Sequence, residues 1–219
     1  MHPVLRLYED VLSSAENVMF TLPPLPRFIF VVHGSATIDG RAVSAGEGWQ
    51  GEGAVTVKPS GEGVTCWRWE LAEGSRGSTT ANAPGMMTHE KLTAFLETLP
   101  KGDLIMRADS VGFPSGGCAY LHRHRGPGIR CLIDGAIRID THGRSTSYGP
   151  GGAWYEAGPD PVFAQAADRP SRFIRVMILP RDLLGKSSIQ YVNQGDQAKP
   201  KSQQYKIYAD APITFTAKK

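Results

Sequence analysis

FIFVVHGSATID at residues 28–39 is matched 101 residues later by IRCLIDGAIRID at residues 129–140. Both segments begin with an apolar run, turn at a glycine, and continue with apolar and polar residues in alternation. Alternation of this kind is typical of a strand with one buried face. Each segment leads into a Gly-rich turn and a tryptophan, Trp49 or Trp154. A repeat of about 100 residues indicates duplicated β domains, because solenoid repeats are only about 20–50 residues long.

Short apolar runs separated by turn residues fill the rest of the chain. The 219 residues include 25 glycines and 16 prolines, spread between runs such as residues 55–57 and 173–179. Many short strands broken by turns are typical of all-β sandwiches and barrels. One stretch differs, because apolar residues recur at helical spacing between Thr88, a possible N-cap, and Leu99. The sequence therefore predicts an all-β protein of two barrels with one linking helix.

The repeat and the composition divide the chain into four parts. We predict an N-terminal barrel over residues 1–75, a linker with the helix over 76–105, a C-terminal barrel over 106–182 and an extension over 183–219. The extension is polar until the run from Tyr205 to Tyr208. That run could be a strand that returns to pair with the first barrel.

Charge and cysteine content argue against several classes of protein. The chain has 24 Lys and Arg against 21 Asp and Glu, and its basic residues are scattered, unlike those of a nucleic-acid-binding protein. No segment approaches the roughly 20 apolar residues that span a bilayer, and the first residues lack a signal-peptide pattern. Three cysteines without CxxC spacing argue against a disulfide framework and a structural zinc site. These features favour a soluble cytoplasmic protein.

The segment from Tyr120 to Arg130 carries the residues with the clearest chemistry. Because residues two apart on a strand face the same side, His122 and His124 are predicted to point together. Two such imidazoles can share one metal ion at about 2.0–2.1 Å, although histidines two apart are also common on protein surfaces. Tyr120 lies two residues before His122 and is therefore expected on the same face of the strand. Its hydroxyl could contact a bound substrate, or its ring could pack at the barrel rim.

The surroundings of these histidines resemble the cupin superfamily. The first cupin motif has a His-x-His pair followed further along by a glycine, and Gly135 stands at that glycine position here. The second motif, a Gly-rich turn, a strand and a Pro/Gly turn, is similar to residues 151–162. The resemblance covers residues 109–180 directly and residues 20–72 through the repeat. It implies jelly-roll β-barrels, and in the family the histidine pair binds Fe, Mn, Ni, Cu or Zn.

Two positions depart from the cupin pattern. The Glu ligand of the family falls on Gly128, and its late His ligand falls on Val162. Three protein ligands are the usual minimum for a catalytic metal site, so a substitute is needed. Glu156 is the candidate, because it follows Trp154 on a strand that borders the barrel mouth in this family. The alternative is that Glu156 is an exposed turn residue.

Arg130 is a further candidate for the site. If the Gly128 position faces inward, alternation places Arg130 inward too, and a buried unpaired charge is costly. Its partner could be Glu156, in a structural pair, or a substrate carboxylate held by two hydrogen bonds.

The first repeat lacks a comparable set of residues. Transfer of the repeat without gaps puts Thr21 and Pro23 at the positions of the histidines, while His33 falls in a turn. We interpret the first barrel as a degenerate copy that stabilises the second barrel or forms a dimer contact. A homodimer is therefore expected.

Together these features predict a metal-dependent cupin enzyme that acts on a small anionic molecule. The expected site holds one divalent transition metal per chain on His122, His124 and Glu156, with Glu156, Arg130 and Tyr120 facing the substrate. Two histidines and a carboxylate resemble the arrangement in non-haem iron oxygenases, so a dioxygenase-type reaction comes first and an isomerase or lyase reaction second. The missing ligands favour an alternative, a non-catalytic ligand-binding or sensory module.

Overall fold

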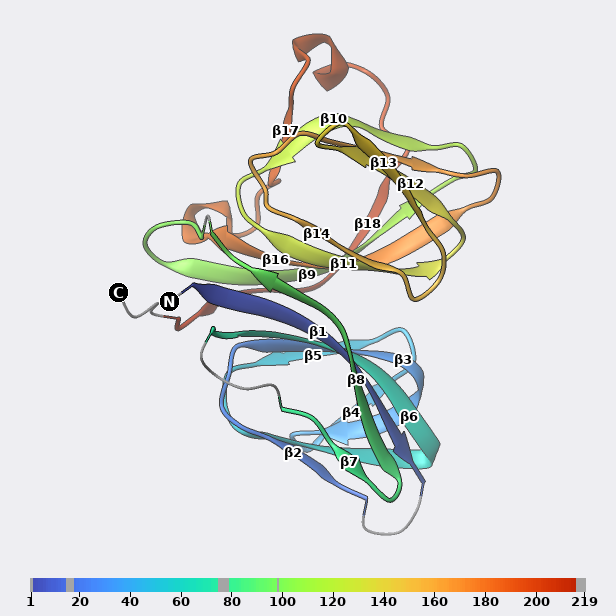
Figure 1. The fold of residues 1–219 in the computed structure, drawn as a ribbon, viewed down its shortest axis with the longest axis vertical. Coiled ribbons are helices and arrows are strands. Elements are labelled where there is room, and N and C mark those ends of the chain that lie inside the picture. The colour runs from blue at the N-terminus through green and yellow to red at the C-terminus, as the bar shows by residue number, and fades with distance from the viewer. Residues whose placement is uncertain (1, 15–17, 75–78, 98, 216–219) are drawn as a thin grey trace. The chain divides into compact units, whose positions relative to one another are not determined.

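The computed structural model describes residues 2–14, 18–74, 79–97 and 99–215. Within these ranges the chain forms strands and two short 3-10 helices, so the prediction of an all-β fold is confirmed. The chain divides into two compact units, residues 1–97 with 213–219 and residues 98–212. Both are drawn in Figure 1. No helix among the described residues is long and apolar enough to cross a membrane.

The first unit contains one eight-stranded sheet. Its strands are β1 (Pro3–Ser13), β2 (Phe20–Leu22), β3 (Arg27–Ile38), β4 (Arg41–Ser44), β5 (Gly48–Gly51), β6 (Val55–Glu73), β7 (Asn82–Ala83) and β8 (Met86–Phe95). They pair in the order β4-β3-β6-β1-β8-β7, and β2 and β5 pair with β6 and β3. The sheet encloses an apolar cluster that includes Ile29, Ile38 and Val57.

Strand β8 occupies the stretch for which the sequence predicted a helix, so the prediction of a helix over residues 88–99 is wrong. It pairs antiparallel with β1, from Met86 opposite Leu12 to Phe95 opposite Val4. The long strand β1 offers a continuous row of backbone donors and acceptors, which outweighs the local helical spacing of apolar side chains. Residues 82–95 are therefore part of the sheet of the first unit.

The second unit is a barrel of two five-stranded sheets. Its elements are β9 (Leu104–Phe113), β10 (Cys118–His124), β11 (Gly128–Asp134), β12 (Ile137–Thr141), β13 (Arg144–Tyr148), β14 (Ala153–Glu156), β15 (Val162–Ala166), β16 (Ser171–Pro180), η1 (Arg181–Leu183), β17 (Ile189–Tyr191), η2 (Gln194–Gln197) and β18 (Gln204–Ile213). The strand orders are β13-β12-β15-β10-β17 and β14-β11-β16-β9-β18. Figure 1 shows the two sheets on opposite sides of the barrel, and apolar side chains such as Trp154 and Phe173 pack between them.

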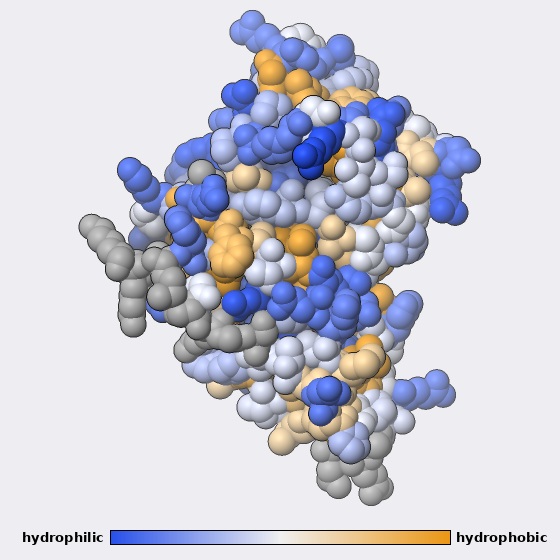
Figure 2. Space-filling model, viewed as in Figure 1, coloured by the Kyte–Doolittle hydropathy of each residue, from blue (hydrophilic) through white to orange (hydrophobic). Residues whose placement is uncertain are grey.

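The C-terminal extension completes the second barrel along one edge. Strand β18 pairs with β9, so the predicted pairing of residues 205–208 with the first barrel is wrong. Strand β17 pairs with β10 at the corresponding edge of the other sheet. Pairing of this kind covers backbone groups that an open sheet edge would expose. The segment around η2 between these strands is mostly hydrophilic on the face shown in Figure 2.

Strand register reproduces the sequence repeat in space. In each unit, one residue of the repeated strand lies opposite the tryptophan of the following turn on one side and an arginine on the other. The matched sets are Ile29 with Trp49 and Arg68, and Arg130 with Trp154 and Arg175. The two units are therefore built on the same strand plan, and they differ in which side chains occupy it.

Buried ion pairs form a closed network in the first unit. The Arg68 guanidinium contacts the Asp10 carboxylate at 2.6 and 3.0 Å and the Glu70 carboxylate at 2.8 Å. The other Glu70 oxygen accepts a hydrogen bond from Arg27 at 3.0 Å. Both arginines are fully buried, and each carboxylate faces at least one of them, so these charges are compensated within the protein.

Candidate metal and ligand site of the second barrel

Strand β10 presents His122 and His124, hereafter the histidine pair, to the inside of the second barrel. Both side chains are buried. Their Nε2 atoms are 3.2 Å apart, and the two rings are nearly perpendicular, at 83°. The structure thus brings the two predicted ligands together, with the same nitrogen of each ring directed to one place.

Hydrogen bonds and burial fix the state of the imidazoles. His122 Nδ1 lies 2.7 Å from the carbonyl oxygen of Tyr120, which can only accept, so Nδ1 carries the proton. Burial lowers the pKa of His122 and lowers that of His124 further, with Arg175 and Arg130 adding to the second effect. Both rings are therefore neutral near pH 7, and His122 Nε2 is unprotonated and carries a lone pair.

Ser188 allows His124 to adopt either tautomer. The Ser188 hydroxyl lies 3.2 Å from His124 Nδ1 and 3.9 Å from the sulfur of Met177. It can donate to Nδ1 when His124 donates from Nε2 to His122. It can instead accept from Nδ1–H and turn its own proton to Met177, which leaves both Nε2 lone pairs directed to one point. The second arrangement is the one that a shared metal ion requires.

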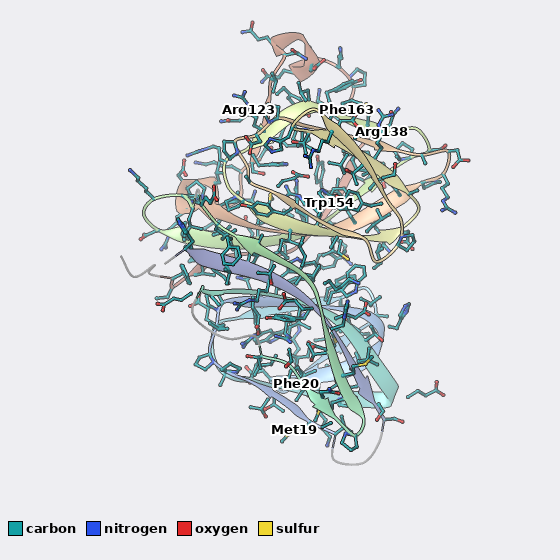
Figure 3. All side chains as sticks on the ribbon, viewed as in Figure 1. Met19, Phe20, Arg123, Arg138, Trp154 and Phe163 are labelled. Atoms are coloured by element: carbon teal, nitrogen blue, oxygen red, sulfur yellow. The ribbon has the colours of Figure 1, made fainter. Side chains whose placement is uncertain are left out.

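Glu156 approaches the histidine pair from β14, a strand of the other sheet. Its Oε1 accepts a hydrogen bond of 2.9 Å from the indole of Trp154, the residue that Figure 3 labels within the ring of the second barrel. Its Oε2 lies 2.7 Å from Arg130 Nη2 and 3.8 Å from His124 Nε2. In the strand register, Glu156 is the direct partner of Gly128. A carboxylate is therefore present one strand away from the position where the cupin pattern has one.

The two departures from the cupin pattern both border this site. Val162 lies directly opposite His122 in the pairing of β15 with β10, and it is buried. A Cβ atom at Gly128 would lie 2.4 Å from the Val176 carbonyl oxygen, so a side chain there would require the backbone of β16 to shift. The Gly128 carbonyl instead accepts a hydrogen bond of 2.7 Å from Arg130. Neither position supplies a side-chain ligand.

Two arginines and two carboxylates balance one another around the histidines. Burial lowers the pKa of Arg130 to about 10, and the nearby Glu156 carboxylate limits that fall. Burial acts on Arg175 in the same direction, but Asp109 holds its pKa above the ordinary value, through hydrogen bonds of 2.9 and 2.7 Å. The site therefore contains paired charges beside neutral imidazoles.

Tyr120 does not share the inner face with the histidine pair. A bulge in the pairing of β10 with β15 between Ala119 and His122 breaks the alternation on which the expectation rested. The Tyr120 ring lies 4.8 Å from Lys199 Nζ. In the described part of the chain, its hydroxyl makes no hydrogen bond to either imidazole. Ser188 contacts His124 instead, and the polar sequence of the extension gave no signal of that role.

The donor set fits a transition metal in part. Two imidazole nitrogens and a carboxylate oxygen are ligands of divalent iron, manganese and zinc. Two bonds of about 2.1 Å at tetrahedral or octahedral angles place their donors about 3.0–3.4 Å apart, which the 3.2 Å between the Nε2 atoms satisfies. Glu156 must leave Arg130 to complete the set. As they stand, the described residues contain no group of three or more His, Cys, Asp or Glu that could hold a metal.

Comparison with solved structures identifies the fold. A cupin 2 conserved barrel domain protein from Leptotrichia buccalis matches with a TM-score of 0.50 and 13% identity over 81% of this chain and 84% of its own. Oxalate decarboxylase from Lactobacillus farciminis, in a formate complex, gives 0.58 and 12% over 91% and 82%. AerE from Microcystis aeruginosa gives 0.57 and 12% over 82% and 89%. No protein-family model and no curated protein sequence matches. The chain therefore has the fold of two cupin-type barrels.

Proposed function

We propose that the second barrel holds one divalent transition metal on His122, His124 and Glu156 and acts on a small anionic molecule. The observation that supports this most strongly is the convergence of two buried, neutral imidazoles at 3.2 Å. In one tautomer of His124 the two nitrogens satisfy each other through an N–H···N hydrogen bond. In the other tautomer two buried lone pairs face each other, which is unfavourable unless they gain a common partner. A metal ion is the partner that accepts both lone pairs.

Glu156 is shared between two possible cations in this proposal. Without a metal its Oε2 pairs with Arg130 at 2.7 Å. Once Glu156 turns to a metal, Arg130 is buried without a counter-ion, which is strongly unfavourable. An anionic group of the substrate can then take the place of Glu156, because the guanidinium fork binds carboxylates through two hydrogen bonds. Metal and anion would therefore strengthen each other's binding.

The residues of the barrel then have distinct roles. Arg130 orients the anionic end of the substrate, and Trp154 positions Glu156 and excludes water. A bound ion would supply Lewis-acid or redox chemistry. We place a dioxygenase-type reaction first, since two histidines and one carboxylate are the ligands of many non-haem iron oxygenases, and an isomerase or lyase reaction second.

A non-catalytic ligand-binding module is the second candidate function. The observation that favours it is the ion pair between Arg130 and Glu156, which engages the third ligand and leaves the metal site incomplete. In such a module the barrel would bind its ligand through Arg130 without a metal ion.

Metal content separates the two functions. The protein would be reconstituted with Fe, Mn, Ni, Cu or Zn, desalted and measured by plasma mass spectrometry. We expect about one ion per chain for one of these metals, loss of the ion in His122→Ala/His124→Ala, and weaker retention in Glu156→Gln. His33→Ala/His89→Ala, which changes two exposed histidines, is the matched control. Full retention by the first variant, or no retention by the wild type, would contradict the metal proposal.

A further inference from the structure

The C-terminal extension builds a chamber beside the histidine pair. A cavity of about 760 Å³ has walls from β17 and β18, the strands at matching edges of the two sheets. Its floor includes Arg175 and Asp109 from the barrel interior. Ser188, which also lines this cavity, lies 3.2 Å from His124 Nδ1. The chamber is therefore next to the proposed reaction site, on the side of Ser188.

Two tyrosines give the chamber aromatic walls. Tyr191 comes from β17 and Tyr205 from β18, and Ile189 and Ile207 add apolar surface beside them. Burial raises the pKa of both phenols, so both rings are uncharged near pH 7. Neutral rings on two facing edges suit a planar ligand, since aromatic groups gain from offset or edge contacts beyond simple burial.

The charge of the chamber favours an anion. Its lining contains four cationic side chains and one carboxylate: Arg107, Arg175, Lys186, Lys201 and Asp109. The two arginines are matched, Arg175 by Asp109 and Arg107 by Asp210, at 2.7 and 2.9 Å. Within the described residues neither lysine forms an ion pair with a carboxylate. The Lys201 ammonium instead donates to backbone carbonyls, including that of Lys199 at 2.8 Å, and lies 4.3 Å from the Tyr191 ring.

We propose that this chamber binds an aromatic carboxylate, with the ring between Tyr191 and Tyr205 and the carboxylate toward Lys186 and Lys201. The assignment goes beyond the proposed function, because neither Arg130 nor the histidine pair lines the chamber. The binding step itself requires only the chamber. A lining with two unmatched lysines and two tyrosines selects for a ligand that has both a negative charge and a flat ring.

Calorimetric titration of the full chain with three small probes tests this selectivity. Benzoate has both features, cyclohexanecarboxylate has only the charge, and benzamide has only the ring. We expect benzoate to bind about two- to twelvefold more tightly than cyclohexanecarboxylate, because aromatic contacts of this kind contribute about 0.5–1.5 kcal/mol. Benzoate should also bind more tightly than benzamide, which lacks the charge that the lysines attract. Added salt should weaken benzoate and leave benzamide unchanged. Equal affinity for all three probes, or no heat with millimolar benzoate, would overturn the proposal.

Variants locate the binding site within the chamber. Tyr205→Leu, which keeps apolar bulk, should weaken benzoate about three- to tenfold, and Lys186→Gln should weaken it and reduce its salt dependence. The matched control is Lys206→Gln, which removes a charge from the same strand as Tyr205 at a residue outside the cavity lining. Circular dichroism would confirm folding of each variant. The chamber assignment fails if the Lys206 control weakens benzoate as much as Lys186→Gln.

The same titration distinguishes failure of this inference from failure of the proposed function. His122→Ala/His124→Ala should lose metal and still bind benzoate. If it loses benzoate while Tyr205→Leu keeps it, the ligand binds at the histidines and the chamber proposal is wrong. If the wild type holds no metal but binds benzoate through Tyr205 and Lys186, the metal proposal fails and the chamber proposal stands.

Discussion

The interiors of the two barrels both contain buried arginines and carboxylates, but they differ in how these charges are paired. In the first, Arg68 lies between Asp10 and Glu70, and every charge of the network has a partner within the protein. In the second, Arg130 and Glu156 form a pair that borders two neutral imidazoles. A closed network leaves nothing for a ligand to replace, whereas the second interior offers lone pairs and one carboxylate that can change partners.

One position of the shared strand plan illustrates this difference. Ile29 and Arg130 occupy equivalent places, each between a tryptophan and an arginine of its own unit. The apolar Ile29 belongs to the core cluster of the first unit, while Arg130 brings a buried cation to the middle of the second. The same strand plan can therefore enclose a fully paired set of charges or place a buried cation beside two neutral imidazoles.

Breaking the closed network should have the largest effect on stability. Arg68→Ala leaves Asp10 and Glu70 buried without their main cation and should lower the free energy of unfolding by about 3–5 kcal/mol. The control is Arg172→Ala, which breaks an exposed pair with Asp134 and should cost less than about 1 kcal/mol. Urea unfolding followed by circular dichroism measures both. Similar losses in the two variants would show that the buried network is not the stabilising element.

Acid should destabilise the second barrel through the histidine pair. The folded pKa of each imidazole is lowered from 6.5, so below that pH the unfolded chain binds protons that the folded chain does not. The free energy of unfolding should decrease as the pH is lowered, by up to about 1.4 kcal/mol per pH unit for each histidine, until the folded rings protonate. Above pH 7 both states are neutral and the effect vanishes.

Urea unfolding of the metal-free protein between pH 7.5 and 5 measures this slope. His122→Gln/His124→Gln should flatten it, while His33→Gln/His89→Gln, which changes two exposed histidines, should leave it unchanged. The same slope in all three proteins would mean that the acid sensitivity arises elsewhere.

The smallest effect concerns the tryptophans at equivalent positions of the two units. Trp154→Phe removes the indole donor from Glu156 Oε1 and should weaken metal binding about 10–100-fold, as loss of a ligand's supporting hydrogen bond commonly does. Trp49→Phe changes the equivalent residue of the first unit and should leave affinity unchanged. Competition with a chelator of known affinity compares the two. If the two variants bind the metal with the same affinity, Trp154 has no role in positioning Glu156.

Local patterns in the sequence were sufficient to predict the two β units and the common inward direction of His122 and His124. Strand β8, which covers residues 86–95 where the sequence predicts a helix, was not predictable from spacing, because its stability comes from pairing with β1, far away in the sequence. The position of Tyr120 was misjudged for a related reason. A bulge depends on how two strands meet, and strict alternation along one strand cannot reveal it.

Pairing across strands also decides the surroundings of Glu156. Counting along the cupin motifs finds a gap at Gly128 but cannot show which residue lies beside that gap. Register supplies the answer, since Glu156 is its direct partner across β11 and β14. The contact between Ser188 and His124 likewise depends on where β17 adds to the sheet, and the sequence of the extension carries no pattern that fixes it.

The close packing around Gly128 restricts the substitutions that this position can tolerate. A Cβ atom there would lie 2.4 Å from the Val176 carbonyl oxygen and 2.8 Å from Met177 Cγ, and the first of these atoms belongs to backbone that cannot simply rotate away. A substitution that introduces a carboxylate at this position would have to displace the backbone of strand β16. A carboxylate is therefore accommodated more readily on the neighbouring strand, at Glu156, than at residue 128 itself.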